Sequence, residues 1–365
     1  MRITRTRSLR AVAVTAIIAL TVGCASEAAP DETPASPTVE EQTETTPEAM
    51  LDVPDPRSLT GLTEARELGA IEPVASDPEV SLPATVTGDD GVEVTVESVD
   101  RIVTLDIYGT ISQTIVGLGL SENVVGRSVS DTDPSIEDAP LVTSGAHAVS
   151  PEAVLQERPT LVLLDTTLGP ANTQNVLREA GVAVVVLDPD RRADLIDEQI
   201  RMIAEATGTV EAGEQLIEQT NEQLDETREY ISQLTAELDE PLRMAVLYVR
   251  GTAGIFFLFG GESAAKGLIE DLGGEHVAEA IGAGETVPAN AESLVTIDPE
   301  LFMMMHDGLE STGGLDGLTE RPGVAQTTAG INQRVVSAPD AQLISFGPNY
   351  PQALRALADA IYLGQ

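Results

Sequence analysis

Tyr248 and Arg250 stand two positions apart at the end of an expected strand, 244–249. Residues two apart on a strand face the same way, so both side chains could point into one cleft. A phenol ordinarily titrates at about 10, but a neighbouring guanidinium favours its anion, and phenolate is a ligand for ferric iron. The pair is therefore chemically consistent with a ligand for ferric iron. The alternative is an ordinary strand tyrosine.

His147 is a second residue with the chemistry of a metal ligand. It lies on the loop that leaves a strand, just before Ser150, which is expected to cap a helix. Open α/β sheets expose ligands on such loops, and neutral imidazole binds iron well. The alternative is a histidine that faces solvent. Of the two other histidines, His306 is a candidate pocket residue because it follows the apolar strand 300–305, whereas His276 is expected at the surface.

Apolar side chains near these residues could line the same pocket. The segment 255–259 holds three of the five phenylalanines of the chain and is expected to be a buried core strand, with Phe256 as a candidate pocket wall. Met305 ends a Met-rich strand whose expected role is core packing, and it is a second candidate for the wall. Tyr350 is a third, because it could flank the cleft.

Alternating strands and helices must position these residues. Apolar strands separated by amphipathic helices predict parallel sheets covered by helices on both faces, preceded by a hairpin over 84–96. The strand-and-helix pattern is interrupted by 191–238, which contains mostly good helix formers and is broken at Thr207–Gly208. The second part, 210–238, is expected to be one long helix. The other expected strands are 102–105, 123–126, 160–164, 182–187 and 334–337, and the other helices 110–118, 151–158, 170–180, 263–272, 292–297 and one from Pro351.

The predicted fold class is therefore α/β, with two Rossmann-like lobes of parallel sheet joined by one long helix. A short internal repeat supports two related lobes, because Glu152 and Glu292 each open a helix, with a proline seven places later and an apolar strand after it. The expected divisions are 1–23 for a signal peptide, 24–83 for a lipidated cysteine and a disordered acidic tether or arm, 84–190 for the N-terminal lobe, 191–240 for a helical linker and 241–365 for the C-terminal lobe.

The amino terminus predicts export and lipid anchoring. Four arginines precede an apolar stretch, 11–23, which has the length of a signal peptide and is too short to span a membrane. Cys24, the only cysteine, follows at once. This arrangement resembles a lipobox, although Thr21 stands where leucine is more usual. The alternative is an ordinary secretory signal with an incidental cysteine.

The composition excludes several classes of function. The chain has 365 residues and a formal net charge of −40, so nucleic acids and anionic lipids would be repelled from its body. We find neither a Gly-x-Ser-x-Gly elbow nor a phosphate-binding Gly-x-x-x-x-Gly-Lys loop, nor clustered metal ligands. The sequence therefore predicts a binding protein and not an enzyme.

Two lobes joined by a long helix resemble the class III periplasmic binding proteins, which serve iron-siderophore, cobalamin and haem importers. The resemblance covers 84–365. It implies that Glu152 and Glu292 dock onto arginines of the membrane permease. The alternative is that each stabilises the dipole of its own helix.

Within that family the chain is most similar to actinobacterial haemin-binding lipoproteins of haem ABC importers. The resemblance depends on the segments around 143–152, 247–251 and 306–315. It implies that His147 and Tyr248 are the axial ligands of a transported ferric haem and that Arg250 assists. It also implies a monomer on the extracytoplasmic face of the cell membrane, held only by its lipid anchor, whose partners are a permease and its ATPase. A ferric siderophore or cobalamin is the alternative cargo.

Overall fold

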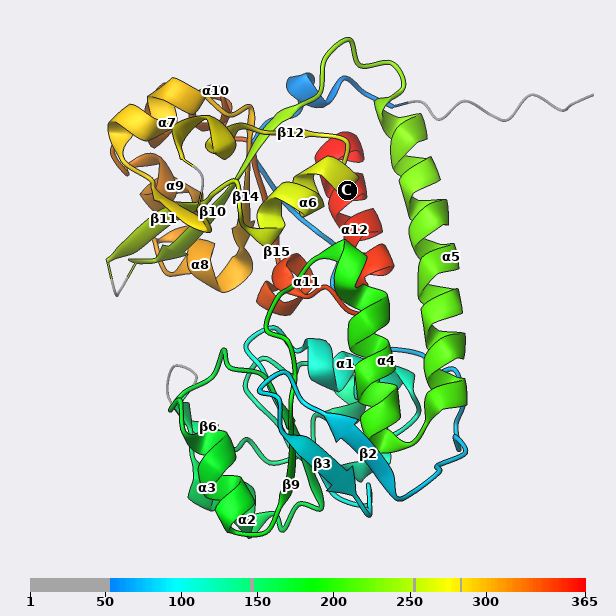
Figure 1. Cartoon of the computed structure of the whole chain (residues 1–365). Coiled ribbons are helices and arrows are strands. Elements are labelled where there is room, and N and C mark those ends of the chain that lie inside the picture. Colours follow the sequence, from blue (N-terminus) through cyan, green and yellow to red (C-terminus); the bar gives the residue numbers. More distant parts are fainter. Residues whose placement is uncertain (1–52, 145–147, 252–253, 283) are drawn as a thin grey trace, which may run out of the picture. The chain divides into compact units, whose positions relative to one another are not determined.

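A computed structural model describes residues 53–365 apart from 145–147, 252–253 and 283 (Figure 1). The expected signal peptide, Cys24 and His147 lie outside the described residues. No helix within these residues is long and apolar enough to cross a membrane.

The N-terminal lobe is built on a four-stranded parallel sheet in the order β5-β4-β8-β9. Every residue of β4 and β8 is buried, which is why both read as continuous apolar runs. Ser150 caps α2 by accepting the Ala153 amide, as expected. The strands of this lobe are β2 (Ala84–Thr87), β3 (Glu93–Val96), β4 (Ile102–Leu105), β5 (Val124–Gly126), β6 (Thr143–Ser144), β7 (Ala148–Val149), β8 (Leu161–Leu164) and β9 (Ala183–Val186), and its helices are α1 (Thr110–Gly117), α2 (Pro151–Gln156) and α3 (Thr173–Glu179).

The C-terminal lobe contains a seven-stranded sheet in the order β1-β15-β14-β10-β11-β13, with β12 paired to β10. Its strands are β1 (Leu62–Glu64), β10 (Arg243–Arg250), β11 (Ile255–Phe259), β12 (Glu275–His276), β13 (Thr286–Pro288), β14 (Leu301–Met305) and β15 (Val335–Ala338). Its helices are α6 (Ala264–Asp271), α7 (Ala291–Ile297), α8 (His306–Glu310), α9 (Gly314–Thr319), α10 (Thr328–Ile331), α11 (Asp340–Ile344) and α12 (Tyr350–Ala358). The core of the sheet is parallel, as expected, but β11 and β13 run antiparallel to their neighbours.

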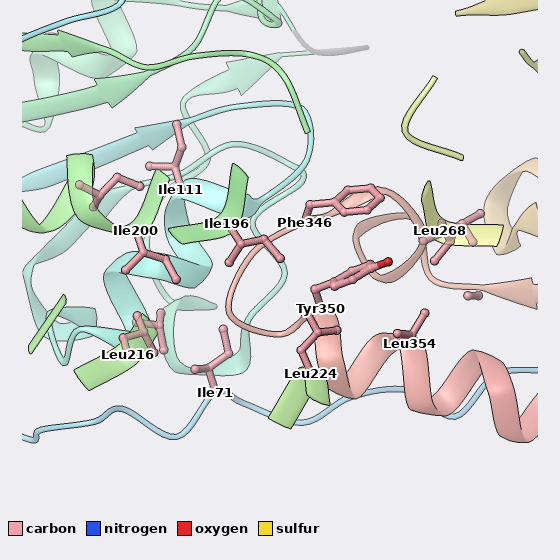
Figure 2. Packing of buried hydrophobic residues seen from close by; sticks show 14 of the residues in the cluster. Ile71, Ile111, Ile196, Ile200, Leu216, Leu224, Leu268, Phe346, Tyr350 and Leu354 are labelled. Carbon is pink, nitrogen blue, oxygen red and sulfur yellow. The ribbon is translucent and has the colours of Figure 1, made fainter. Parts of the chain in front are cut away.

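One long helix joins the lobes, as the sequence predicts. α4 (Ile196–Thr207) ends at Gly208, whose φ of 72° suits glycine, and α5 (Val210–Thr235) then runs for 26 residues, about 39 Å at 1.5 Å per residue. α5 packs against α4 at one end and α12 along the other (Figure 1). Side chains from both lobes, Ile111 and Tyr350 among them, belong to one continuous apolar core (Figure 2). This shared core stiffens the joint between the lobes.

An N-terminal arm, 53–83, crosses from one lobe to the other. β1 pairs in parallel with β15 at the edge of the C-terminal sheet. Further along, the Val74 amide donates to the Gly117 carbonyl of the N-terminal lobe at 2.9 Å. The sequence predicted a disordered acidic tether or arm over 24–83, but residues 62–64 form a strand because β15 supplies its hydrogen-bond partners.

Two expectations for the C-terminal lobe are wrong. β11 is not a buried core strand, because Leu258 alone among its residues is fully buried. The phenylalanines of β11, which lies next to the edge strand β13, stay partly exposed. His276 is not at the surface. It is 7% exposed, and its Nε2 lies 3.1 Å from the Phe259 carbonyl oxygen.

Candidate functional site

A cavity of about 1250 Å³ opens between the two lobes. It exceeds the roughly 300–1,000 Å³ that is usual for small-molecule pockets, so it has room for a large ligand. Three parts of the chain line it: the ends of the N-terminal strands, the ends of the C-terminal strands, and residues 64–69 of the N-terminal arm.

The wall from the N-terminal lobe is the start of α1 and the loop after β5. Gly109 begins α1 with a φ of 75°, and a Cβ there would lie 2.6 Å from the Ser130 carbonyl oxygen, so the close approach of the loop requires glycine. Arg127 holds the loop by donating to the carbonyls of Asp131, Glu137 and Ala139 at 3.0–3.1 Å. These contacts fix the loop that forms this wall.

The loop also connects the cavity to the region of His147. Val129 lines the cavity, and its amide donates to Thr143 Oγ1 at 3.1 Å. Thr143 belongs to β6, which pairs with β7. His147 itself lies between these strands in sequence and outside the described residues.

Tyr248 and Arg250 both line the wall from the C-terminal lobe. They lie on the same face of β10, and the Arg250 Cζ is 4.8 Å from the centroid of the Tyr248 ring. Two rings of β11 also contact the Tyr248 ring: Phe257 is stacked on it at 4.7 Å, and Phe259 meets it edge-on at 6.1 Å. Arg250 also forms an ion pair with Asp340 Oδ2 at 2.5 Å. The tyrosine is thus oriented by aromatic rings and a guanidinium, in a wall that also contains charged and polar side chains.

Met305 and His306 also line the cavity, as expected of both. Met305 is 3% exposed, so it packs in the hydrophobic core and also forms part of the cavity wall. The imidazole of His306 lies between two carboxylates, with Nδ1 3.7 Å from Glu64 and Nε2 3.6 Å from Glu310.

Phe256 and Tyr350 do not line the cavity, which corrects two candidate assignments. Phe256 packs under Arg321, whose Cζ lies 4.8 Å from the ring centroid. Tyr350 is 2% exposed, stacks on Phe346, and donates its hydroxyl to Asp271 Oδ2 at 2.7 Å (Figure 2). Alternation along β11 and burial at the start of α12 turn these rings away from the cavity.

Several cavity residues were not foreseen. Arg66 and its neighbours reach the cavity through the N-terminal arm, and Asp340 reaches it from the start of α11. A three-residue strand and a short helix carry no recognisable period, so the sequence could not place these residues, whereas the Tyr-x-Arg spacing and the end of the Met-rich strand identified other parts of the wall.

Below the N-terminal wall lie three buried carboxylates, two of which share one arginine. Arg191 lies 2.7 Å from Asp165 and 3.5 Å from Asp106. Asp131 accepts hydrogen bonds from the Ser128 amide and the Thr104 hydroxyl. Burial, reinforced by the charge of Asp106, raises the pKa of Asp131 to about 7 and that of Asp165 to about 6. The described residues contain no group of three or more acidic, histidine or cysteine side chains arranged to hold a metal ion.

Glu152 and Glu292 occupy equivalent exposed positions in the first turns of α2 and α7. Each helix has a polar N-cap, Ser150 in one and Asn290 in the other. The repeat seen in the sequence is therefore also a repeat of local structure.

A family model described as periplasmic binding protein matches residues 103–341. The chain belongs to the periplasmic binding protein family. Membership of a family of binding proteins agrees with the expectation that the chain is not an enzyme, and the α/β fold class is confirmed.

Solved structures of the family are similar over most of the chain. A crystal structure of heme binding protein HmuT is 44% identical, covers 85% of this chain and 100% of its own, and superposes with a TM-score of 0.81. Periplasmic heme-binding protein RhuT from Roseiflexus sp. RS-1, in its apo form, is 33% identical, covers 72% of this chain and 98% of its own, and has a TM-score of 0.66.

Two further comparisons bear on the site and the compartment. Other structures of HmuT carry alanine in place of one histidine, one tyrosine and one arginine, the last two being two positions apart. YvrC of Bacillus subtilis (strain 168), an uncharacterized ABC transporter substrate-binding lipoprotein, is 21% identical over 284 residues, which are 77% of this chain and 86% of YvrC.

Proposed function

We propose that this protein captures ferric haem in the cavity between its lobes and delivers it to the permease of an ABC importer. The observation that carries the proposal is the Tyr248–Arg250 pair on the cavity wall. The similarity to HmuT over the whole length of that protein supports haem as the cargo. The size of the cavity fits a flat macrocycle better than a small metabolite.

Tyr248 is the proposed iron ligand from the C-terminal lobe. The guanidinium lies over the ring at 4.8 Å, so its positive charge would favour a phenolate once the oxygen binds Fe(III). Stacking on Phe257 fixes the plane of the ring, so its hydroxyl is oriented before haem arrives. Arg250 therefore acts through the tyrosine, as a positioning residue.

His147 is the proposed ligand from the N-terminal lobe. It follows Thr143 by four positions, and Thr143 is hydrogen-bonded to a residue of the cavity wall. The substituted histidine of HmuT precedes its substituted tyrosine by 99 positions, and His147 precedes Tyr248 by 101. Ligands from both lobes would hold the iron from its two sides.

Delivery requires a membrane partner and an anchor. Glu152 and Glu292, one on each lobe, are the proposed contacts to permease arginines, because both carboxylates are exposed at helix starts. Cys24 is the proposed site of lipidation, which would hold the monomer on the extracytoplasmic face of the cell membrane. The similarity to the lipoprotein YvrC supports this location.

A hemin titration of the purified protein tests the cargo. We expect a saturable one-to-one change in the Soret band that neither cobalamin nor a ferric hydroxamate siderophore prevents when added in excess. If the protein fails to bind hemin and binds either competitor, that competitor is the cargo and the haem assignment is wrong. The assignment of the fold to an importer family would not change.

A further inference from the structure

The cavity is acidic, although its proposed cargo carries two propionate carboxylates. Five acidic side chains line it: Glu64, Glu67, Asp133, Asp307 and Asp340. Only two arginines, Arg66 and Arg250, offset them among the described lining residues. The two carboxylates of such a ligand need a cationic partner in this field, because carboxylates beside carboxylates are repelled.

The guanidinium of Arg250 already has three partners within the protein. It is paired with Asp340 at 2.5 Å, donates to the Val249 carbonyl at 3.1 Å and lies over the Tyr248 ring. A guanidinium that neutralises one carboxylate and supports a phenolate has little charge left for a propionate.

Arg66 is available. Its side chain is exposed into the cavity, and it forms no ion pair or side-chain hydrogen bond within the part of the chain that the structure describes. Its flexible side chain can therefore meet a carboxylate without first breaking another contact, and arginine binds carboxylates through two parallel hydrogen bonds.

The backbone on both sides of Arg66 is fixed. The Ala65 amide donates to the Ser337 carbonyl at 2.8 Å, which continues the pairing of β1 with β15. Gln342, only 8% exposed, clamps the next residues: its Nε2 donates to the Arg66 carbonyl at 2.8 Å and its Oε1 accepts the Leu68 amide at 3.2 Å. A buried side chain thus holds the arm in place while the guanidinium stays unpaired.

We infer that Arg66 pairs with a propionate of the bound haem, so that the N-terminal arm is part of the binding site and not only a tether. This inference depends on the proposed function. Arg66 is then a residue that determines affinity for the carboxylates of the cargo, and it has no part in binding the iron.

The test compares hemin with its dimethyl ester, in which both carboxylates are esterified. Arg66→Gln should weaken hemin binding about tenfold, the equivalent of one charged hydrogen-bonded contact, and should leave the affinity for the ester unchanged. The Soret position should not move, because the iron ligands are untouched. Arg192→Gln, which removes an exposed arginine outside the cavity, is the matched control and should bind both ligands as the wild type does.

The outcomes separate the two proposals. Wild-type protein that does not bind hemin overturns the proposed function and this inference with it. Wild-type binding that Arg66→Gln leaves intact, or weakens equally for hemin and the ester, overturns the role of Arg66 and leaves haem capture standing. Equal melting temperatures of the variants and the wild type confirm that the comparison is between folded proteins.

Discussion

Replacing Arg250 tests whether a guanidinium must support the tyrosine. The Arg250 Cζ lies 4.8 Å from the centroid of the Tyr248 ring, over which a phenolate delocalises part of its charge. Two unit charges about 5 Å apart interact by about 3.3 kcal/mol at an effective dielectric constant of 20 and by about 0.8 kcal/mol in water. The Arg250 side chain is 26% exposed, and Asp340 offsets part of its charge, so we expect the lower half of that range. Arg250→Gln should therefore weaken hemin binding by about 1.4 kcal/mol, which is tenfold.

The assay is a titration followed at the Soret band, and the chain offers a closely matched control. Arg321 also lies 4.8 Å from a ring centroid in the same lobe, but its partner is Phe256, outside the cavity. Arg321→Gln removes the same kind of contact and should bind hemin as the wild type does. Equal affinity of Arg250→Gln and the wild type, or an equal loss in Arg321→Gln, would refute the reasoning.

Three further predictions concern other parts of the molecule. Burial raises the pKa of Asp131 to about 7, so the folded state binds that proton more tightly than the unfolded state. The free energy of unfolding should therefore decrease as pH rises from about 4 through 7. The melting temperature should fall over this range, and it should fall less steeply in Asp131→Asn. Tyr350→Phe leaves the partly buried Asp271 without one donor, and should lower the free energy of unfolding in urea by about 1 kcal/mol while hemin affinity stays the same. Glu152→Ala combined with Glu292→Ala should keep hemin binding but reduce haem-stimulated ATP hydrolysis by the reconstituted importer severalfold; undiminished hydrolysis would contradict docking through these carboxylates.

The sequence was most informative where one element alone determines a feature. The apolar runs of β4 and β8 identify buried parallel strands, because both faces of such strands are covered. A stretch of good helix formers, interrupted only at Gly208, identifies α4 and α5. The two-residue spacing of Tyr248 and Arg250 requires only that they share a strand, and that is what places both on the cavity wall.

Features that depend on contacts between distant segments could not be predicted. β1 is three residues long, and it is a strand because β15 lies beside it. His276 is buried by β11, which precedes it by seventeen residues, and nothing in its own neighbours indicates this. Arg66 belongs to the cavity for the same reason, since Gln342, from the far end of the chain, holds its backbone there.

The central claim is that ligands from both lobes hold ferric haem, and the absorption spectrum of the hemin complex tests it most directly. Spectra of wild type, His147→Ala and Tyr248→Phe should be recorded side by side at saturating hemin. We predict that each substitution alters the Soret and visible bands and lowers affinity, and that the two altered spectra differ from each other. Unchanged spectra and affinity in both variants would contradict the assignment of these ligands.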